Sequence, residues 1–121
     1  MSIKIKSRKA KGRNLQKWVA NKVSELLDIP VKKDGDIESR TMGSSGVDVI
    51  LRGKALELFP FSVECKNQQT WTIPAWMKQA KENENEGTDW LLIVKKNGVE
   101  PIIILDAKLF FKLYKKIVKE K

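Results

Sequence analysis

A chain of 121 residues, 41% of them hydrophobic and 32% charged, is long enough to form one domain with a buried core and too short for two. It has no histidine and a single cysteine, Cys65, which excludes histidine-based zinc sites, histidine-dependent catalytic triads and an internal disulfide. No apolar run approaches the roughly 20 residues that cross a bilayer, and no apolar stretch follows the basic N-terminus as in a secretory signal. We therefore expect a reduced, cytoplasmic protein without membrane contact.

The excess of positive charge predicts a nucleic acid as the partner. Twenty-four Lys and Arg against 15 Asp and Glu give a net charge of +9. We expect residues 1–11 to form a flexible basic arm that contacts phosphates, followed by a single domain over residues 12–121. A second group of lysines, within residues 108–121, is expected to face solvent. The basic residues at the N-terminus, with no acid among them, are Lys4, Lys6, Arg8, Lys9, Lys11 and Arg13.

Hydrophobic periodicity and turn residues predict an α/β fold. Pro30 ends the first helix, Asn97-Gly98 marks a tight turn between the last two strands, and Asp106 caps the final helix. In chain order, the predicted elements are a helix at 15–27, strands at 37–42, 47–51 and 58–66, a helix beginning at 72, strands at 90–94 and 101–105, and a helix after 106.

Asp48, Glu64 and Lys66 carry the clearest chemical signal. Asp48 lies within an apolar strand, at 47–51, where a carboxylate is costly unless a cation or hydrogen bonds compensate its charge. Strand side chains alternate between faces, so Glu64 and Lys66 point the same way and Cys65 points into the packed interior. The pattern indicates a divalent ion held beside a lysine that handles protons or phosphate charge.

A hairpin between the two strands would bring the carboxylates together. Residues 52–57 are polar at their start and contain a glycine, so a turn there would place Asp48 roughly opposite Glu64, with Cβ atoms about 4.5–5.5 Å apart. A backbone carbonyl of the second strand, such as that of Cys65, would complete an all-oxygen shell. Such a shell favours Mg²⁺, with Mn²⁺ as a substitute, over zinc. Lys66 would orient the attacking water or stabilise the phosphate.

Taken alone, a Glu-x-Lys triplet on a strand is typical of a solvent-facing row of ion pairs. Together, however, the strings Gly46-Val47-Asp48-Val49-Ile50-Leu51 and Phe61-Ser62-Val63-Glu64-Cys65-Lys66-Asn67-Gln68 resemble the core signature of the PD-(D/E)xK nuclease superfamily. Within it, the chain is similar to small phage and archaeal-type Holliday junction resolvases, over about residues 11–106. The resemblance implies a restriction-endonuclease-like α/β core, with a mixed central β-sheet flanked by helices in the order α-β-β-β-α-β-β-α.

The resemblance also implies further site residues. Many members have a glutamate on the first helix that supports the metal; the corresponding residue here is Gln16, which can accept a hydrogen bond but adds no charge. We therefore expect the catalytic set to be Asp48, Glu64, Lys66 and Gln16. The Gly-Ser loop at 43–46 resembles a family loop whose serines contact a phosphate, with simple Gly-Ser flexibility as the alternative. The expected DNA contacts are Lys9, Lys11, Arg13, Arg40, Ser44, Ser45, Gln68 and Gln79.

The function that the resemblance implies is a magnesium-dependent endonuclease that hydrolyses DNA phosphodiester bonds. Its expected substrate is a four-way junction, cut by a homodimer, in the host-cell cytoplasm if a phage encodes the chain. Two alternatives stay open. One is a catalytically inactive nucleic-acid-binding module on the same fold, which the glutamine at position 16 favours. The other is a nuclease for other DNA structures, such as a nicking or restriction-like enzyme.

Overall fold

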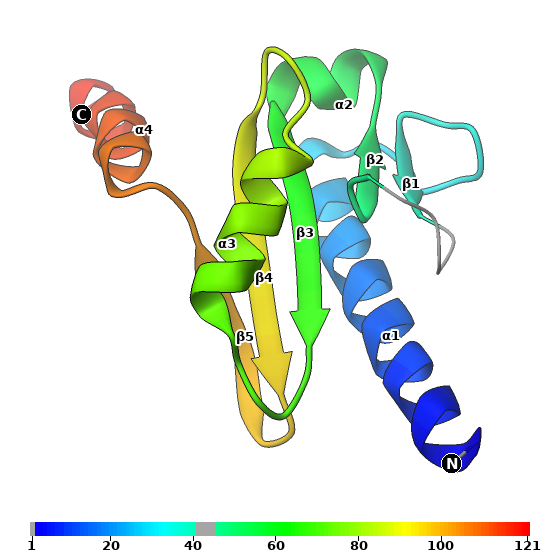
Figure 1. The fold of residues 1–121 in the computed structure, drawn as a ribbon. Helices are drawn as coiled ribbons and strands as arrows, with labels where there is room; N and C mark the ends of the chain where they lie inside the picture. Colours follow the sequence, from blue (N-terminus) through cyan, green and yellow to red (C-terminus); the bar gives the residue numbers. More distant parts are fainter. Residues whose placement is uncertain (1, 41–45) are drawn as a thin grey trace.

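A mixed five-stranded sheet forms the centre of the molecule (Figure 1). The computed structural model describes residues 2–40 and 46–121, and the side chains of that part from residue 8 onward. The strands lie across the sheet in their order along the chain; β3 and β4 are parallel, whereas the other neighbours are antiparallel. The strands are β1 (Ile37–Ser39), β2 (Val49–Leu51), β3 (Phe61–Asn67), β4 (Asp89–Lys96) and β5 (Val99–Ile104).

Helices cover both faces of this sheet (Figure 1). The long α1 (Ser2–Leu27) packs on one face and α3 (Ile73–Glu82) on the other. The short α2 (Gly53–Leu58) joins β2 to β3, and α4 (Ala107–Lys119) follows β5 and projects away from the sheet. The predicted α/β class, with a mixed sheet flanked by helices, is confirmed. Within the described ranges, no helix combines the length and apolar character needed to cross a membrane.

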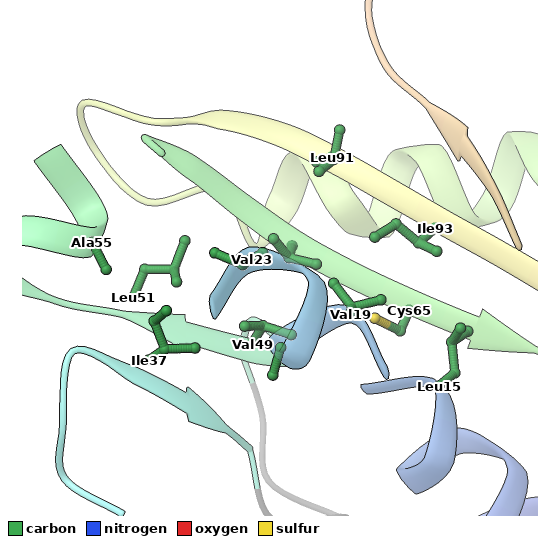
Figure 2. Packing of buried hydrophobic residues seen from close by; sticks show 12 residues of the cluster. Leu15, Val19, Val23, Ile37, Val49, Leu51, Ala55, Cys65, Leu91 and Ile93 are labelled. Atoms are coloured by element: carbon green, nitrogen blue, oxygen red, sulfur yellow. The ribbon is translucent and has the colours of Figure 1, made fainter. Parts of the chain in front are cut away.

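Two apolar clusters, one on each face, hold the helices to the sheet. On the α1 side, Leu15, Val19 and Val23 pack against buried residues of the strands (Figure 2). On the α3 side, Trp76 and Ala80 pack against alternate residues of β4. Because β4 is buried on both faces, its sequence is a continuous apolar run and not an alternating one. These two clusters hold α1 and α3 on opposite faces of the sheet, whose strand β3 carries the Glu-x-Lys triplet.

The connection between β2 and β3 differs from the sequence prediction. We expected a tight hairpin turn, but residues 53–58 form helix α2, so the element order gains a helix. The helix begins at Gly53, which has a positive φ of 52°, and its residue Ala55 is fully buried. The carboxylate of Asp36 accepts a hydrogen bond from the Lys54 amide at 3.1 Å and stabilises the first turn. The helix propensity of residues 54–58 and the burial of Ala55 thus outweigh the tendency of the polar residues at the start of this segment to form a turn.

The N-terminal residues from Ser2 onward are helical. Helix α1 begins at Ser2, so residues 2–11 continue the helix on which Leu15 and Val19 are buried. This segment contains no proline, and Gly12 is the only glycine between Ser2 and Leu27, so nothing in the sequence interrupts the helix. The division into an arm at 1–11 and a domain at 12–121 stays a prediction.

Candidate metal and phosphodiester site

Asp48 and Glu64 meet where β2 and β3 lie side by side. Val49 pairs with Val63, which places Asp48 opposite Glu64, as the strand spacing predicts. The Asp48 amide donates to the Val63 carbonyl at 2.8 Å, and the Cys65 amide donates to Oδ2 of Asp48 at 2.7 Å. Asp48 is therefore held to β3 by its backbone and by its side chain. The predicted alignment of the two acids is present although the connection is a helix.

Glu64 is buried, and Asp48 is partly buried. Only 3% of Glu64 is exposed, and this burial, together with the negative charge of Asp48, raises the pKa of Glu64 to about 7. Burial also raises the pKa of Asp48, while the hydrogen bond from the Cys65 amide opposes that shift. The ammonium of Lys66 lowers the pKa of both carboxyl groups through its charge. A divalent cation would offset the charge of this pair more fully than one lysine does.

A cavity of about 670 Å³ opens beside these acids, at the end of β3 and between α1 and α3. Its wall contains all the residues predicted to act in catalysis or metal binding: Gln16, Asp48, Glu64, Cys65 and Lys66. Side chains from two helices and two strand ends thus converge on one space, which is large enough for a hydrated ion and a phosphate group.

Gln16 reaches the cavity from α1 and is 5% exposed. Its Oε1 accepts from the Ser39 hydroxyl at 3.5 Å, so the amide is oriented by the end of β1. The N-terminal half of α1 is joined to the end of β3 by Asn67, whose Nδ2 donates to the Lys11 carbonyl at 3.1 Å. Gln16, which we predicted to take the place of a glutamate, is therefore a buried neutral amide on the cavity wall.

Asn83 is a site residue that the sequence reasoning missed. Its Nδ2 donates to Oε1 of Glu64 at 2.6 Å, which lowers the pKa of that carboxyl group against the effect of burial. Arg8 was not chosen as a site residue either, yet it lines the cavity. Asn83 lies in a polar run that looks solvent-exposed, and its orientation depends on how α3 ends against the sheet. The one feature of the sequence that could have identified Asn83 is its position directly after the amphipathic stretch that forms α3.

The predicted DNA contacts divide into two groups. Lys11, Gln68 and Gln79 line the cavity, so they lie close to the paired acids. Lys9 and Arg13 are exposed on α1 but do not contribute to the cavity wall. They lie at the same level of α1 as the lining residues but on another face of the helix, so any phosphate that they bind would lie outside the cavity.

Arg40 stabilises the backbone just ahead of the acidic strand. Its Nε donates to the carbonyl of Val47, and its positive charge lowers the pKa of Asp48. Arg40 is only partly exposed, so its charge lies close enough to Asp48 to affect the site. Ser44 and Ser45, predicted to contact a phosphate, lie outside the described residues.

The donor set fits a hard divalent cation. Asp48, Glu64 and Gln16 offer oxygen atoms, and burial raises the pKa of the Cys65 thiol well above its ordinary value, so this sulfur stays protonated. In the part of the chain that the structure describes, no group of three Asp, Glu, Cys or His side chains could hold a metal. The acids would therefore supply at most two ligands to a bound cation, and backbone, amide or water oxygens would supply the rest.

Comparison with known proteins agrees with this geometry. The family model described as "Phage putative PDDEXK endonuclease" matches residues 7–121, which include the whole sheet and the cavity. Neither the curated proteins nor the solved structures give a significant match. The chain therefore belongs to this phage PDDEXK endonuclease family, whose fold is restriction-endonuclease-like and whose members are divalent-metal-dependent nucleases.

Proposed function

We propose that the protein is a magnesium-dependent endonuclease that cuts four-way DNA junctions as a homodimer, in the cytoplasm of the phage-infected cell. The observation that supports the chemistry best is the pairing of the partly buried Asp48 with the buried Glu64 beside Lys66, on the wall of a cavity that Arg8 and Lys11 also line. Two neighbouring carboxylates with little access to water are unfavourable unless a cation between them compensates their charge.

Each side chain has a defined role in this proposal. Asp48 and Glu64 hold the ion, Mg²⁺ or Mn²⁺, through the oxygens that face the cavity. In an extended strand, the amide and carbonyl of one residue point to the same edge. The Cys65 amide donates to Asp48, so the carbonyl of Cys65 is offered on the same side as a third ligand. The bound ion would stabilise negative charge on the phosphate and lower the pKa of a water molecule.

Lys66 acts on the reacting groups, and Gln16 can act on them or support the ion. Lys66 lies on the same face of β3 as Glu64, so its ammonium can contact the scissile phosphate or the attacking water. The Oε1 of Gln16 accepts from Ser39, so the Nε2 hydrogens do not take part in that contact and can donate to a phosphate oxygen. The phosphate backbone would approach along α1, where Arg8 and Lys11 lie in the cavity wall.

The test is cleavage by the purified protein of four-way junction, flap, linear duplex and single-stranded DNA, with and without Mg²⁺. We expect Mg²⁺-dependent cutting that is strongest on the junction. Asp48→Asn and Glu64→Gln keep the size of each side chain but remove its charge, and should abolish cutting while junction binding persists. Glu57→Gln, an exposed glutamate on α2, is the matched control and should cut normally. Full activity in both site variants would refute the proposed site.

A second candidate is a nucleic-acid-binding module that does not cut. The neutral Gln16 favours it, because the ion would be held by two acids and not three. Junction binding without cleavage of any of the four DNA substrates, in Mg²⁺ or in Mn²⁺, would establish this alternative. Mg²⁺-dependent cutting of linear duplex in preference to the junction would instead assign a nicking or restriction-like activity to the same residues.

A further inference from the structure

The last helix exposes a continuous apolar face. Phe110, Leu113, Tyr114 and Ile117 are three and four residues apart, so they form one stripe along α4, with Phe111 at its flank. No residue of α4 is buried, and Phe111 is 70% exposed. The rings of Phe110 and Tyr114 stack with centroids 5.9 Å apart, which keeps the stripe ordered. The opposite side of the helix carries Lys108, Lys112, Lys115, Lys116 and Lys119.

A second apolar surface lies on the main body of the molecule. A groove of about 230 Å³ runs between the C-terminal half of α1 and the α1 side of β4 and β5. Trp18 and Leu26 form one wall, and Ile93 and Ile103 form the other. Ile103 pairs with Ile93 across β4 and β5, so both face α1, yet Ile103 is 56% exposed and Leu26 is 69% exposed. Helix α1 thus leaves this corner of the sheet uncovered.

We propose that α4 of one copy packs in this groove of a second copy, while the α4 of the second copy packs in the groove of the first. The inference deepens the homodimer part of the proposed function and rests on it, although it needs none of the catalytic chemistry. Among the residues that the structure describes, none packs on the apolar face of α4 closely enough to bury it, and none fills the groove. A reciprocal exchange satisfies both surfaces with twofold symmetry and leaves neither exposed.

The helix is directed away from the body on which its own groove lies. Only Leu105 and Asp106 separate β5 from α4, and the Asp106 carboxylate caps the helix by accepting from the amides of Lys108, at 2.9 Å, and Leu109, at 3.3 Å. A short connection and a fixed cap set the direction in which α4 leaves the sheet (Figure 1). Since no α4 residue lines the groove, the second copy is the occupant that the geometry favours.

The exposed area is sufficient for a stable dimer. The side chains involved are exposed over 44% to 70% of their surface, and aromatic ones each offer roughly 150–250 Å² when fully covered. Covering all of them would remove at most roughly 800 Å² from each copy, which is the share of one partner in an interface of standard size. They are Trp18, Leu26, Ile103, Phe110, Phe111, Tyr114, Ile117 and Val118. The lysine side of α4 would stay in solvent, where it can face DNA.

The first experiment measures molar mass by sedimentation equilibrium over a concentration series of the full-length chain. We expect a dimer for the parent protein. Tyr114→Glu on the helix and Ile103→Glu in the groove should each raise the dimer dissociation constant by roughly a hundredfold or more, because a symmetric dimer buries the new carboxylate twice. Lys115→Glu, on the solvent side of α4, is the matched control and should not change it.

A second experiment identifies which surfaces meet. A copy with Tyr114→Cys is mixed with a differently tagged copy with Ile103→Cys under mild oxidation; the native Cys65 is buried and does not compete. A disulfide between the two tagged chains supports the exchange. A single chain with both substitutions that closes an internal disulfide and sediments as a monomer overturns it. A dimer that survives Ile103→Glu overturns the groove as its binding site.

Two further outcomes separate this inference from the nuclease proposal and from a lipid surface. A parent protein that is monomeric but cuts junctions overturns the exchange and leaves the nuclease intact. A dimer with the expected cross-link but without cleavage leaves the exchange intact and overturns the nuclease. A monomer whose α4 binds vesicles with anionic phospholipid, and loses this binding in Tyr114→Glu, would assign the apolar face to a membrane surface and overturn the exchange.

Discussion

Replacing Asn83 with alanine removes the side chain that donates a hydrogen bond to the buried Glu64 carboxylate, and so tests what that bond contributes to stability. The Asn83 side chain donates to Oε1 of Glu64 at 2.6 Å, and Glu64 is 3% exposed, so water cannot easily take the place of the amide. A hydrogen bond to a charged group contributes about 1.5–3 kcal/mol, whereas one between neutral groups contributes about 0.5–1.5 kcal/mol. The effect of Asn83→Ala on the free energy of unfolding should therefore depend on whether Glu64 is ionised.

The direction of this pH dependence follows from the pKa of Glu64. Its value in the folded protein is about 7, raised from an ordinary 4.5, and the bond from Asn83 lowers it. At pH 5, Glu64 is protonated in parent and variant alike, so the loss should be about 1 kcal/mol or less. Above pH 7, the parent holds an ionised Glu64 that the amide stabilises, so the loss should rise to about 1.5–3 kcal/mol.

Urea unfolding without divalent ions, at pH 5 and at pH 8.5, measures both values. Asn85→Ala is the control, because Asn85 lies in the same loop, is exposed and uses only its backbone in hydrogen bonds. The variant should also bind Mg²⁺ more weakly, since the unsupported carboxylate keeps its proton to higher pH. A loss of stability that is equal at both pH values would show that Asn83 acts on the fold and not on the charge of Glu64.

Four other tests address the rest of the site and its basic surface. The pKa of Glu64 is raised on folding, so the folded state binds its proton more tightly; without metal, stability should fall by roughly 3 kcal/mol as the pH rises from 4.5 to about 7. Mg²⁺ should raise the melting temperature at pH 8 and have little effect at pH 5, and equal shifts at both would contradict a site formed by these acids. Gln16→Glu should tighten Mg²⁺ binding, as measured by calorimetry, and lower metal-free stability at pH 8, because it adds a third carboxylate beside Asp48; unchanged affinity would place Gln16 outside the metal shell. Deletion of residues 1–9, which removes four basic residues, should flatten the dependence of log K for DNA on log salt by up to about 3–4, and an unchanged slope would exclude this segment from binding.

The pairing of the two acidic strands could be predicted, but the element between them could not. Alternation of side chains fixes which residues share a face, and antiparallel pairing of two nearby strands puts Asp48 opposite Glu64 for many connection shapes. The connection depends on tertiary contacts. Its helix is stabilised by burial of Ala55 and by the Asp36 carboxylate, and Asp36 is 17 residues before Gly53 in sequence. The helix propensities of residues 53–58 alone could not predict that contact.

The limits of prediction are similar on the helical walls of the cavity. Periodicity identified Leu15, Val19 and Val23 as core residues, because an amphipathic stripe needs a sheet to cover it. It gave no reason for the helix to continue back to Ser2, since the earlier turns lie beyond the apolar stripe. As a result, Arg8 was expected on a mobile arm, whereas the structure has it on the wall of the cavity.

The charges around the cavity explain why the acids tolerate burial before any ion is bound. Desolvation raises the pKa of both acids, and the negative charge of Asp48 raises that of Glu64 further; the positive charge of Lys66 opposes both shifts, and that of Arg40 opposes the shift of Asp48. Arg8, Lys11 and Lys66 line the cavity, so their positive charges would attract a phosphate once a bound cation offsets the two acids. An ion bound between the acids would then take over the compensation, leaving Lys66 free to contact the phosphate. One set of basic side chains can therefore stabilise the metal-free fold and bind the DNA backbone, so Lys66→Ala should lower both stability and DNA affinity.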